Sequence, residues 1–296
     1  MRDVRRRLRV TGTRLFTRAL RTLGLRDQIR GRRSARKRRR RAAAEALGDD
    51  RLSRPALHDL DSKLDAIIAR ERGFFVEAGA HDGFTQSNTY YLERFRGWRG
   101  VLVEPIPEQA AEARLSRPDA TVVQCALTSP VDAGCRVRMS FGDLMSIVIG
   151  AKDREWTNNG TMLGWYDPYE IEVEARTLSS VLDEVRAPEI DLLSLDIEGC
   201  EAAALRGLDL DRHAPRYILV EIHDRVEGRP SIDHALGDRY VVHGWLSPID
   251  LLYVRTDVGV ARPAVEGGWC RATTKHEPAL DVRFRQAGEQ GLERYA

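Results

Sequence analysis

Short apolar runs alternate with helical stretches over the middle of this 296-residue chain, and this alternation limits the fold more than any other feature. Neighbouring parallel strands need a long crossover, usually a helix, so the pattern predicts a parallel sheet covered by helices on both faces. The predicted strands are Phe74–Ala78, Gly100–Glu104, Thr121–Leu127, Ile190–Asp196 and Tyr217–His223. The predicted helices are Asn88–Arg96, Pro107–Leu115, Leu178–Val185 and Glu201–Arg206.

Two more apolar runs follow this alternating region. Tyr240–Leu246 and Leu251–Arg255 are separated by a turn at Ser247 and Pro248, which predicts an antiparallel hairpin at the edge of the sheet. Helical spacing of leucine and isoleucine begins near Pro55, a residue suited to the first turn of a helix.

We therefore expect three parts in the chain: a basic arm over residues 1–50, a folded domain over residues 51–255, and a C-terminal extension over residues 256–296. The extension shows little periodicity and has no assigned role. Inside the domain, residues 141–170 are rich in Gly, Asn, Trp and Tyr and predict a functional loop. Its aromatic residues are available to stack on a sugar or another ring: Trp156, Trp165 and Tyr166.

The charge of the chain is unevenly distributed. Residues 1–41 contain 17 arginines, one lysine and two acids, a net charge of +16, whereas the whole chain carries +2. Apolar residues spaced by three and four predict a basic amphipathic helix over residues 8–29, and the run RSARKRRRRAAAE predicts a solvated linker. We expect the arm to contact an anionic membrane; a solvated tail without a partner is the alternative. Nucleic acid is a less suitable partner because the folded part is acidic.

The apolar content also limits the location of the chain. The sequence has no run of the roughly 18–20 apolar residues that a membrane span needs, and the N-terminus lacks the apolar segment of a secretory signal. The four cysteines are far apart and form no CxxC pair. We expect a cytoplasmic protein with reduced cysteines, which contacts the inner face of the membrane through its arm.

The first two predicted strands carry candidate cofactor residues. Gly79 and Gly83 allow a tight turn and a close approach of a ligand to the backbone. Glu77 lies inside the first strand, where a carboxylate needs a partner. Glu104 ends the second strand, a position from which an acid accepts both hydroxyl groups of a ribose. These residues predict a cofactor that contains a nucleoside.

The turn after the first strand favours one class of nucleoside cofactor. Its sequence is GAHDG and not the GxGxxG of dinucleotide-binding proteins. Asp82 would repel a phosphate, but it suits the ammonium and sulfonium groups of S-adenosylmethionine. Ser87 is a candidate N-cap, which would leave Asn88 and Thr89 in the first helical turn with amides able to hold the cofactor's carboxylate. A turn that only connects strand and helix, and simple capping, are the alternatives.

The ends of two later strands carry candidate catalytic residues. Asp196 and Glu198 follow the fourth strand, and Glu221 and His223 share one side of the fifth. His223 is a natural general base because its ordinary pKa lies near neutrality. The alternative is a histidine that only forms structural hydrogen bonds at the end of the strand. Asp196, Glu221 and His223 could instead hold a divalent cation such as Mg²⁺.

Five segments in order resemble the FkbM family of S-adenosylmethionine-dependent methyltransferases: VEAGAHDGFTQSNTYYLE, GWRGVLVEPIPE, ARTLSSVLDE, IDLLSLDIEGCEAAALRGLD and YILVEIH. The resemblance covers about residues 73–255. It implies the class I methyltransferase (Rossmann-like) α/β fold, with a mostly parallel seven-stranded sheet and an antiparallel edge hairpin. It also implies O-methylation of a hydroxyl on a sugar, glycolipid or secondary metabolite.

The same resemblance implies roles for single residues. By position it implies a first cofactor loop of Glu77, Gly79, Asp82, Gly83 and Asn88, with Glu104 on the ribose and Cys125 and Ala126 beside the adenine. His81 and Ser87 complete the predicted cofactor-binding set. His81 stands where the family often has Asn. Asp196, Glu198, Glu221 and His223 would face the methyl group and its acceptor. A dinucleotide-dependent (NAD) oxidoreductase, or a methyltransferase-like module without catalysis, are the alternative functions.

Overall fold

The computed structural model describes residues 25–140, 147–148 and 169–259. They belong to two compact units, the first ending at Ser53 and the second beginning at Arg54. In the first unit, α2 (Leu25–Glu45) is one continuous helix. The run RSARKRRRRAAAE, expected to be a solvated linker, lies within this helix, and more than half of its residues are exposed. Arginine, lysine and alanine are all good helix formers, so this run is helical despite its charge.

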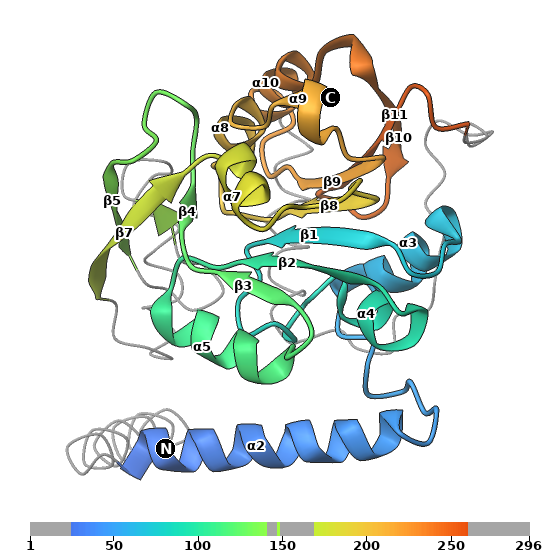
Figure 1. Ribbon diagram of the computed structural model, residues 1–296, viewed down its shortest axis with the longest axis vertical. Helices are drawn as coiled ribbons and strands as arrows, with labels where there is room; N and C mark the ends of the chain where they lie inside the picture. The colour runs from blue at the N-terminus through green and yellow to red at the C-terminus, as the bar shows by residue number, and fades with distance from the viewer. Residues whose placement is uncertain (1–24, 141–146, 149–168, 260–296) are drawn as a thin grey trace, which may run out of the picture. The chain divides into compact units, whose positions relative to one another are not determined.

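The second unit is built on a seven-stranded sheet in the order β10-β11-β9-β8-β1-β2-β3 (Figure 1). Its strands are β1 (Phe74–Ala78), β2 (Arg99–Val103), β3 (Thr121–Val123), β8 (Leu192–Leu195), β9 (Tyr217–Glu221), β10 (Tyr240–Trp245) and β11 (Asp250–Arg255). The first five are parallel to one another, and β10 and β11 are antiparallel. The prediction of a parallel sheet with an antiparallel hairpin at its edge is confirmed.

Helices cover both faces of this sheet (Figure 1). One face packs on α3 (Leu60–Ile68), α4 (Tyr90–Arg96) and α5 (Pro107–Ser116), and the other on α7 (Leu178–Glu184), α8 (Glu201–Arg206), α9 (Leu210–His213) and α10 (Gly228–Leu236). Short 3₁₀ helices lie at η1 (Leu57–Asp59) and η3 (Gly237–Arg239). Successive strand residues alternate between the two core layers, as the period of two requires: Phe75 packs in one and Val76 in the other.

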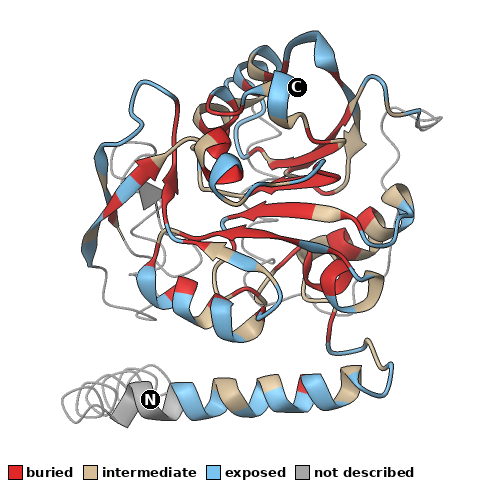
Figure 2. Cartoon of the chain, in the orientation of Figure 1, coloured by how far each residue is buried: buried red, intermediate tan, exposed pale blue. Residues whose placement is uncertain are grey.

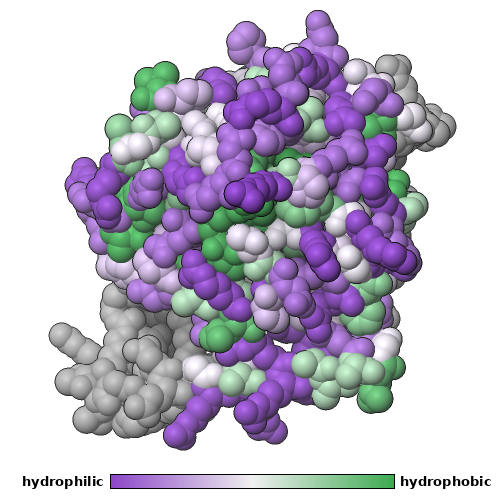
Figure 3. All heavy atoms as spheres, viewed as in Figure 1, coloured by the Kyte–Doolittle hydropathy of each residue, from purple (hydrophilic) through white to green (hydrophobic). Residues whose placement is uncertain are grey.

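The main sheet is buried between the two core layers, and most of the polar residues lie at the surface. Figure 2 shows the strands of the main sheet as the most continuously buried part of the molecule. On the face seen in Figure 3, most side chains are hydrophilic. Because both faces of the sheet are covered, its strands read in the sequence as nearly continuous apolar runs.

A second, four-stranded sheet was not expected from the sequence. It has the order β4-β7-β5-β6, with β4 (Ala126–Leu127), β5 (Arg136–Ser140), β6 (Ile147–Val148) and β7 (Glu170–Arg176). The predicted strand Thr121–Leu127 is therefore wrong in its second half: β3 ends at Val123, and β4 leaves the main sheet to pair with β7. This departure places Ala126 and Leu127 at the side of the main sheet's carboxyl edge.

Some expectations fall outside the described residues. These are most of the predicted helix over residues 8–29, the aromatic residues Trp156, Trp165 and Tyr166, and most of the C-terminal extension. Of the four cysteines, the three in the described part of the chain are free thiols. Among the helices that the structure describes, none combines the length and the apolar character needed to cross a membrane.

Candidate active site

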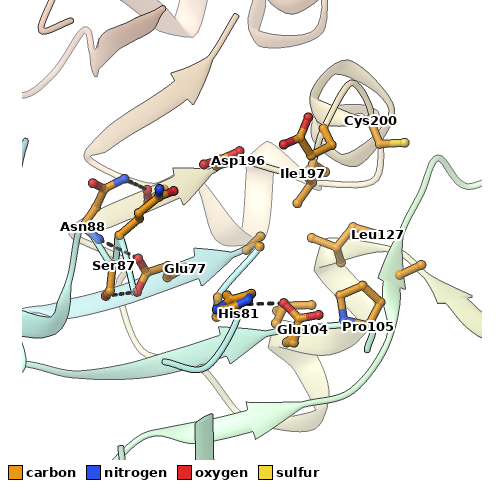
Figure 4. A pocket seen from close by; sticks show the side chains of 18 of the residues that line it. Glu77, His81, Ser87, Asn88, Glu104, Pro105, Leu127, Asp196, Ile197 and Cys200 are labelled. Carbon is orange, nitrogen blue, oxygen red and sulfur yellow. Dashed lines mark hydrogen bonds between the residues drawn. The ribbon is translucent and has the colours of Figure 1, made fainter. Parts of the chain in front are cut away.

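An open pocket of about 910 Å³, including the solvent at its mouth, lies at the carboxyl ends of the parallel strands. This edge is where open α/β sheets bind ligands. The pocket is lined by residues that follow β1, β2 and β8, together with residues of the second sheet (Figure 4). The predicted residues in its lining are Glu77, Gly79, His81, Ser87, Asn88, Glu104, Cys125, Ala126, Asp196 and Glu198.

Gly79 makes the tight turn at the end of β1. Its φ is +83°, and a Cβ atom at this position would lie 1.7 Å from the backbone carbonyl oxygen of Asp196 on the neighbouring strand. Only glycine fits this contact, since it has no side chain and accepts a positive φ. The close approach of the two strand ends forms the floor of the pocket.

Glu77 organises the wall of the pocket from inside the strand. Its carboxylate accepts hydrogen bonds from Ser87 Oγ (2.8 Å) and the backbone amide of Asn88 (2.7 Å) (Figure 4). It also accepts one from Thr89 Oγ1 (2.5 Å). These contacts meet the expectation that the buried carboxylate has partners. Because these bonds occupy its carboxylate, Glu77 stabilises the wall of the pocket and is less available to bind a ligand.

The same bonds correct the expected start of the next helix. Helix α4 begins at Tyr90, so Asn88 and Thr89 precede it, and the amide of Asn88 is already bound to Glu77. That amide therefore does not offer a site for a cofactor's carboxylate. The N-cap residue is Thr89 and not the predicted Ser87, although Ser87 Oγ accepts from the amide of Tyr90 (3.0 Å).

The Asn88 side chain remains a ligand-binding candidate. Its amide nitrogen donates to Ser194 Oγ (3.1 Å), which fixes the rotamer. Its Oδ1 atom is buried and has no hydrogen-bond partner within the described residues. An acceptor that is left unsatisfied in the wall of a pocket indicates a place for a donor on a ligand.

Glu104 lies across the pocket from Asn88, after the end of β2. Its side chain is 5% exposed and accepts from the backbone amides of His81 (2.8 Å) and Ile106 (2.9 Å) (Figure 4). Burial raises the pKa of Glu104 above its ordinary value, against the effect of the two amides. Each carboxylate oxygen keeps a second lone pair, so the predicted contact with a ribose fits the geometry.

Asp82 and Gly83 are not part of the pocket lining, contrary to what was expected of them. The Asp82 carboxylate turns back to its own loop and accepts from the amides of Phe84 (2.9 Å) and Thr85 (2.6 Å). Burial alone would raise its pKa, but these bonds and the neighbouring His81 lower it below its usual range. A Cβ on Gly83 would lie 3.1 Å from Ala113 Cα of α5, so Gly83 serves packing.

The second sheet supplies a wall that was only partly expected. Cys125 and Ala126 line the pocket as predicted, and Leu127 and Met139 join them. Burial raises the pKa of the Cys125 thiol to about 12, so this residue acts as an apolar wall. Met139 could not be assigned from the sequence because its place depends on the pairing of β5 with β7.

Acidic residues gather where β8 and β9 end. Asp196 and Glu198 line the pocket, and Glu198 adopts a left-handed φ of +56°, which is uncommon for a residue other than glycine. The side chains of Asp196 and Glu221 influence each other's pKa directly. Burial, and then the negative charges of Glu221 and Glu198, raise the pKa of Asp196 well above its ordinary value. Burial raises the pKa of Glu221 to about 8, so the pair holds a proton near neutral pH.

His223 completes this group. Its Nε2 atom lies 2.9 Å from Glu221 Oε2 and 4.0 Å from Glu198 Oε2. The contact with Glu221 does not have hydrogen-bond geometry, and the buried Oε2 atom has no hydrogen-bond partner among the described residues. Glu198, Glu221 and His223 offer three ligand atoms within 4.8 Å of one another, a spacing that a metal ion could bridge. This set differs from the predicted metal set in one residue, because Glu198 takes the place of Asp196.

One residue behind the pocket was missed by the sequence analysis. Arg117 is fully buried and contacts both Glu77 and Glu93. In the sequence it is one of many arginines and follows a helix, as solvated arginines often do. The only available signal was that the buried acids near it needed a cation.

Comparisons with known proteins agree with this geometry. Residues 77–237 match the family model described as the Methyltransferase FkbM domain. No curated protein matches this chain. The strand order, with β10 and β11 antiparallel at the edge, is that of the class I methyltransferases.

Several solved structures are distantly similar. A mutant of MtNAS has a TM-score of 0.36 and 13% identity over 68% of this chain and 60% of that one, so this chain spans about three fifths of MtNAS. A TehB-like SAM-dependent methyltransferase from Corynebacterium glutamicum has a TM-score of 0.36 and 12% identity, over 76% of this chain and 99% of that one. An O-methyltransferase from Bacillus cereus in complex with SAH has a TM-score of 0.36 and 14% identity, over 74% and 90%. Likeness at these scores says nothing about the substrate.

The family model covers more than half of the chain, and the pocket lies where that fold places its cofactor. The alternative of a dinucleotide-dependent oxidoreductase is therefore wrong. The chain belongs to the FkbM family of S-adenosylmethionine-dependent methyltransferases.

Proposed function

We propose that this chain transfers the methyl group of S-adenosylmethionine to a hydroxyl group of a sugar, a glycolipid or a secondary metabolite. The observation that supports this most is the acidic pair Asp196 and Glu198 in the lining of the cofactor pocket, with Glu221 and His223 next to Glu198. Transfer to an alcohol is an in-line displacement that needs the two reactants in position and a base for a weakly acidic proton. A thiol or an amine acceptor would need less help from a base.

His223 is the residue best suited to take this proton. With a proton on Nε2 facing Glu221, the imidazole keeps Nδ1 as the atom that accepts the hydroxyl proton. The negative charge that remains on the Asp196–Glu221 pair beside Nε2 then stabilises the imidazolium that forms. Asp196 lines the cofactor pocket, and burial together with the charges of Glu221 and Glu198 raises its pKa, which keeps the charge of the group low.

A divalent cation fits the same residues. Glu198, Glu221 and His223 would hold it, and the buried Glu221 Oε2 atom without a hydrogen-bond partner is suited to be one of the ligands. Two carboxylates and an imidazole are donors that Mg²⁺ or Mn²⁺ accept. Such an ion would lower the pKa of a bound hydroxyl group. Isothermal titration with Mg²⁺ and Mn²⁺ tests this site, with Glu198→Gln as the variant that should lose binding.

The basic arm supports a location at a membrane surface. Helix α2 carries ten basic and two acidic residues. Each Lys or Arg near an anionic lipid surface contributes about 1 kcal/mol to binding, so the helix alone suffices for peripheral attachment. We place the enzyme in the cytoplasm, at the inner face of the membrane, where a lipid-linked acceptor would be within reach.

The test of the proposed reaction uses S-adenosylmethionine with a labelled methyl group. Purified protein is incubated with free glycans and with lipid-linked glycans, and products are analysed by mass spectrometry for one added CH₂ group. A methyl ether, stable to mild base, is the expected product. A base-labile methyl ester or a methylated amine would overturn the assignment to hydroxyl groups.

A matched pair of histidine variants separates catalysis from binding. His223→Gln should lower turnover by about 100-fold or more, whereas His213→Gln, which alters a contact with the exposed Asp183 (2.8 Å) away from the pocket, should not. S-adenosylmethionine binding without turnover on any acceptor would favour a binding module without catalysis.

A further inference from the structure

A charged side chain lies behind the pocket wall, where it cannot touch a ligand. Arg117 follows helix α5, its side chain is 0% exposed, and it is not part of the pocket lining. An arginine stays protonated when it is buried, so its charge must be balanced by fixed partners.

The partners of Arg117 come from three different segments. They are Glu93 Oε2 of α4, 2.7 Å from Nε; the Gly83 carbonyl and Ser87 Oγ, each 3.2 Å from Nη1; and Thr89 Oγ1, 3.1 Å from Nη2. Glu77 Oε2 lies 3.6 Å from Nη1. The guanidinium group thus joins the end of β1, the loop over residues 83–89, and helix α4.

These contacts set the direction of the hydrogen bonds around Glu77. A guanidinium group only donates, so Ser87 Oγ and Thr89 Oγ1 must accept from Arg117. Each hydroxyl group then has its one proton left for the Glu77 carboxylate, at 2.8 Å and 2.5 Å. The remaining oxygen of Glu77 accepts from the amide of Asn88 (2.7 Å), the residue whose side chain faces the pocket.

We propose that Arg117 is a positioning residue for S-adenosylmethionine: through Ser87, Thr89 and Glu77 it holds Asn88 and the pocket wall in the geometry that binds the cofactor. Arg117 itself contacts no ligand. The proposal needs only the binding of S-adenosylmethionine, and it is independent of the acceptor.

The test compares two lysine substitutions on the same helix end. Arg117→Lys keeps the positive charge near Glu93, but one ammonium group cannot span the three segments. We expect the dissociation constant for S-adenosylmethionine, measured by isothermal titration, to rise about tenfold or more. Arg114→Lys is the matched control, because Arg114 is exposed and bonds only the carbonyl of Val122 (3.2 Å).

The same titration separates positioning from general stability. A residue that only stabilises the fold would lower the number of binding sites per chain and leave the dissociation constant of the folded fraction unchanged. A positioning residue raises the dissociation constant at a constant number of sites. With saturating cofactor, turnover should recover most of its parent value, so the effect appears in KM for the cofactor and not in kcat.

A second variant covers the case in which Arg117→Lys does not fold. Thr89→Val has nearly the same volume and removes one of the two hydroxyl groups that join Arg117 to Glu77. It should also raise the dissociation constant at an unchanged number of sites. A dissociation constant within about twofold of the parent in the folded variant, a change worth less than 0.5 kcal/mol, would overturn the proposal.

Discussion

The Glu221 carboxyl should make the stability of the protein fall as the pH rises towards 8. In the folded chain, burial and the charge of Glu198 raise its pKa from 4.5 to about 8, against the effect of Asp196. Between these values the folded state keeps a proton that the unfolded state has released, so a higher pH favours unfolding. The extra stability is complete below a pH of about 4.5 and is lost as the pH approaches 8. The difference between the two pKa values corresponds to at most about 5 kcal/mol in the free energy of unfolding.

The measurement is urea unfolding of the parent and of Glu221→Gln at several values between about pH 5 and 8, with a chelator present to exclude divalent cations. A glutamine cannot titrate, and its amide also removes the negative charge that acts on Asp196. The stability of the variant relative to the parent should therefore increase by a few kcal/mol over this range. Glu184→Gln, at an exposed surface carboxylate, should follow the parent at every pH. If the curves for Glu221→Gln and the parent run parallel, Glu221 does not hold a proton in the folded state.

Three further predictions concern the cofactor, the chemistry and the arm. Gly79→Ala should abolish S-adenosylmethionine binding, because its Cβ would lie 1.7 Å from the Asp196 carbonyl oxygen and a positive φ costs a residue with a side chain about 1–2 kcal/mol; an unchanged dissociation constant would contradict the close approach of the strands. His223→Gln and Asp196→Ala should each lower turnover by about 100-fold or more at an unchanged cofactor dissociation constant, as single-turnover assays and titration can show. Equal losses in both quantities would speak against the catalytic roles. Removal of residues 1–41 should abolish flotation with anionic vesicles and leave methyl transfer to a soluble acceptor intact; flotation that persists would remove the membrane proposal.

The main sheet could be predicted from the sequence because helices cover both of its faces. Strands such as β8 and β9 are then short, mostly apolar runs, with Ser194 inside β8 and Glu221 as the last residue of β9. The second sheet could not be predicted in the same way. Its longer strands, β5 and β7, alternate apolar residues with Arg and Glu and have one exposed face, so they read as polar connecting segments.

Part of the candidate site could likewise be predicted from the sequence, and part could not. The acids at strand ends could be found from the sequence, because the carboxyl ends of parallel strands meet at one edge. Their individual roles depend on where each side chain turns, and local sequence does not determine this. Asp82 binds its own loop, and Glu77 is satisfied by a loop ten residues away and by Arg117, a partner forty positions along the chain. The roles assigned to the other cofactor-binding and catalytic residues stay predictions, which the variants described above would test.

The pairing of β1 with β8 also determines when the pocket can form during synthesis of the chain. Phe75 pairs with Leu192, so more than a hundred residues must be made before the two strands can meet. Closing a loop of this length lowers the entropy of the chain and is slow, and the contacts that offset this loss form only after closure. A nascent chain that ends before β8 has the Gly79 turn but not the Asp196 carbonyl on which that turn packs. We therefore expect cofactor binding to appear in one step as β8 docks, which would make S-adenosylmethionine a reporter of completed folding.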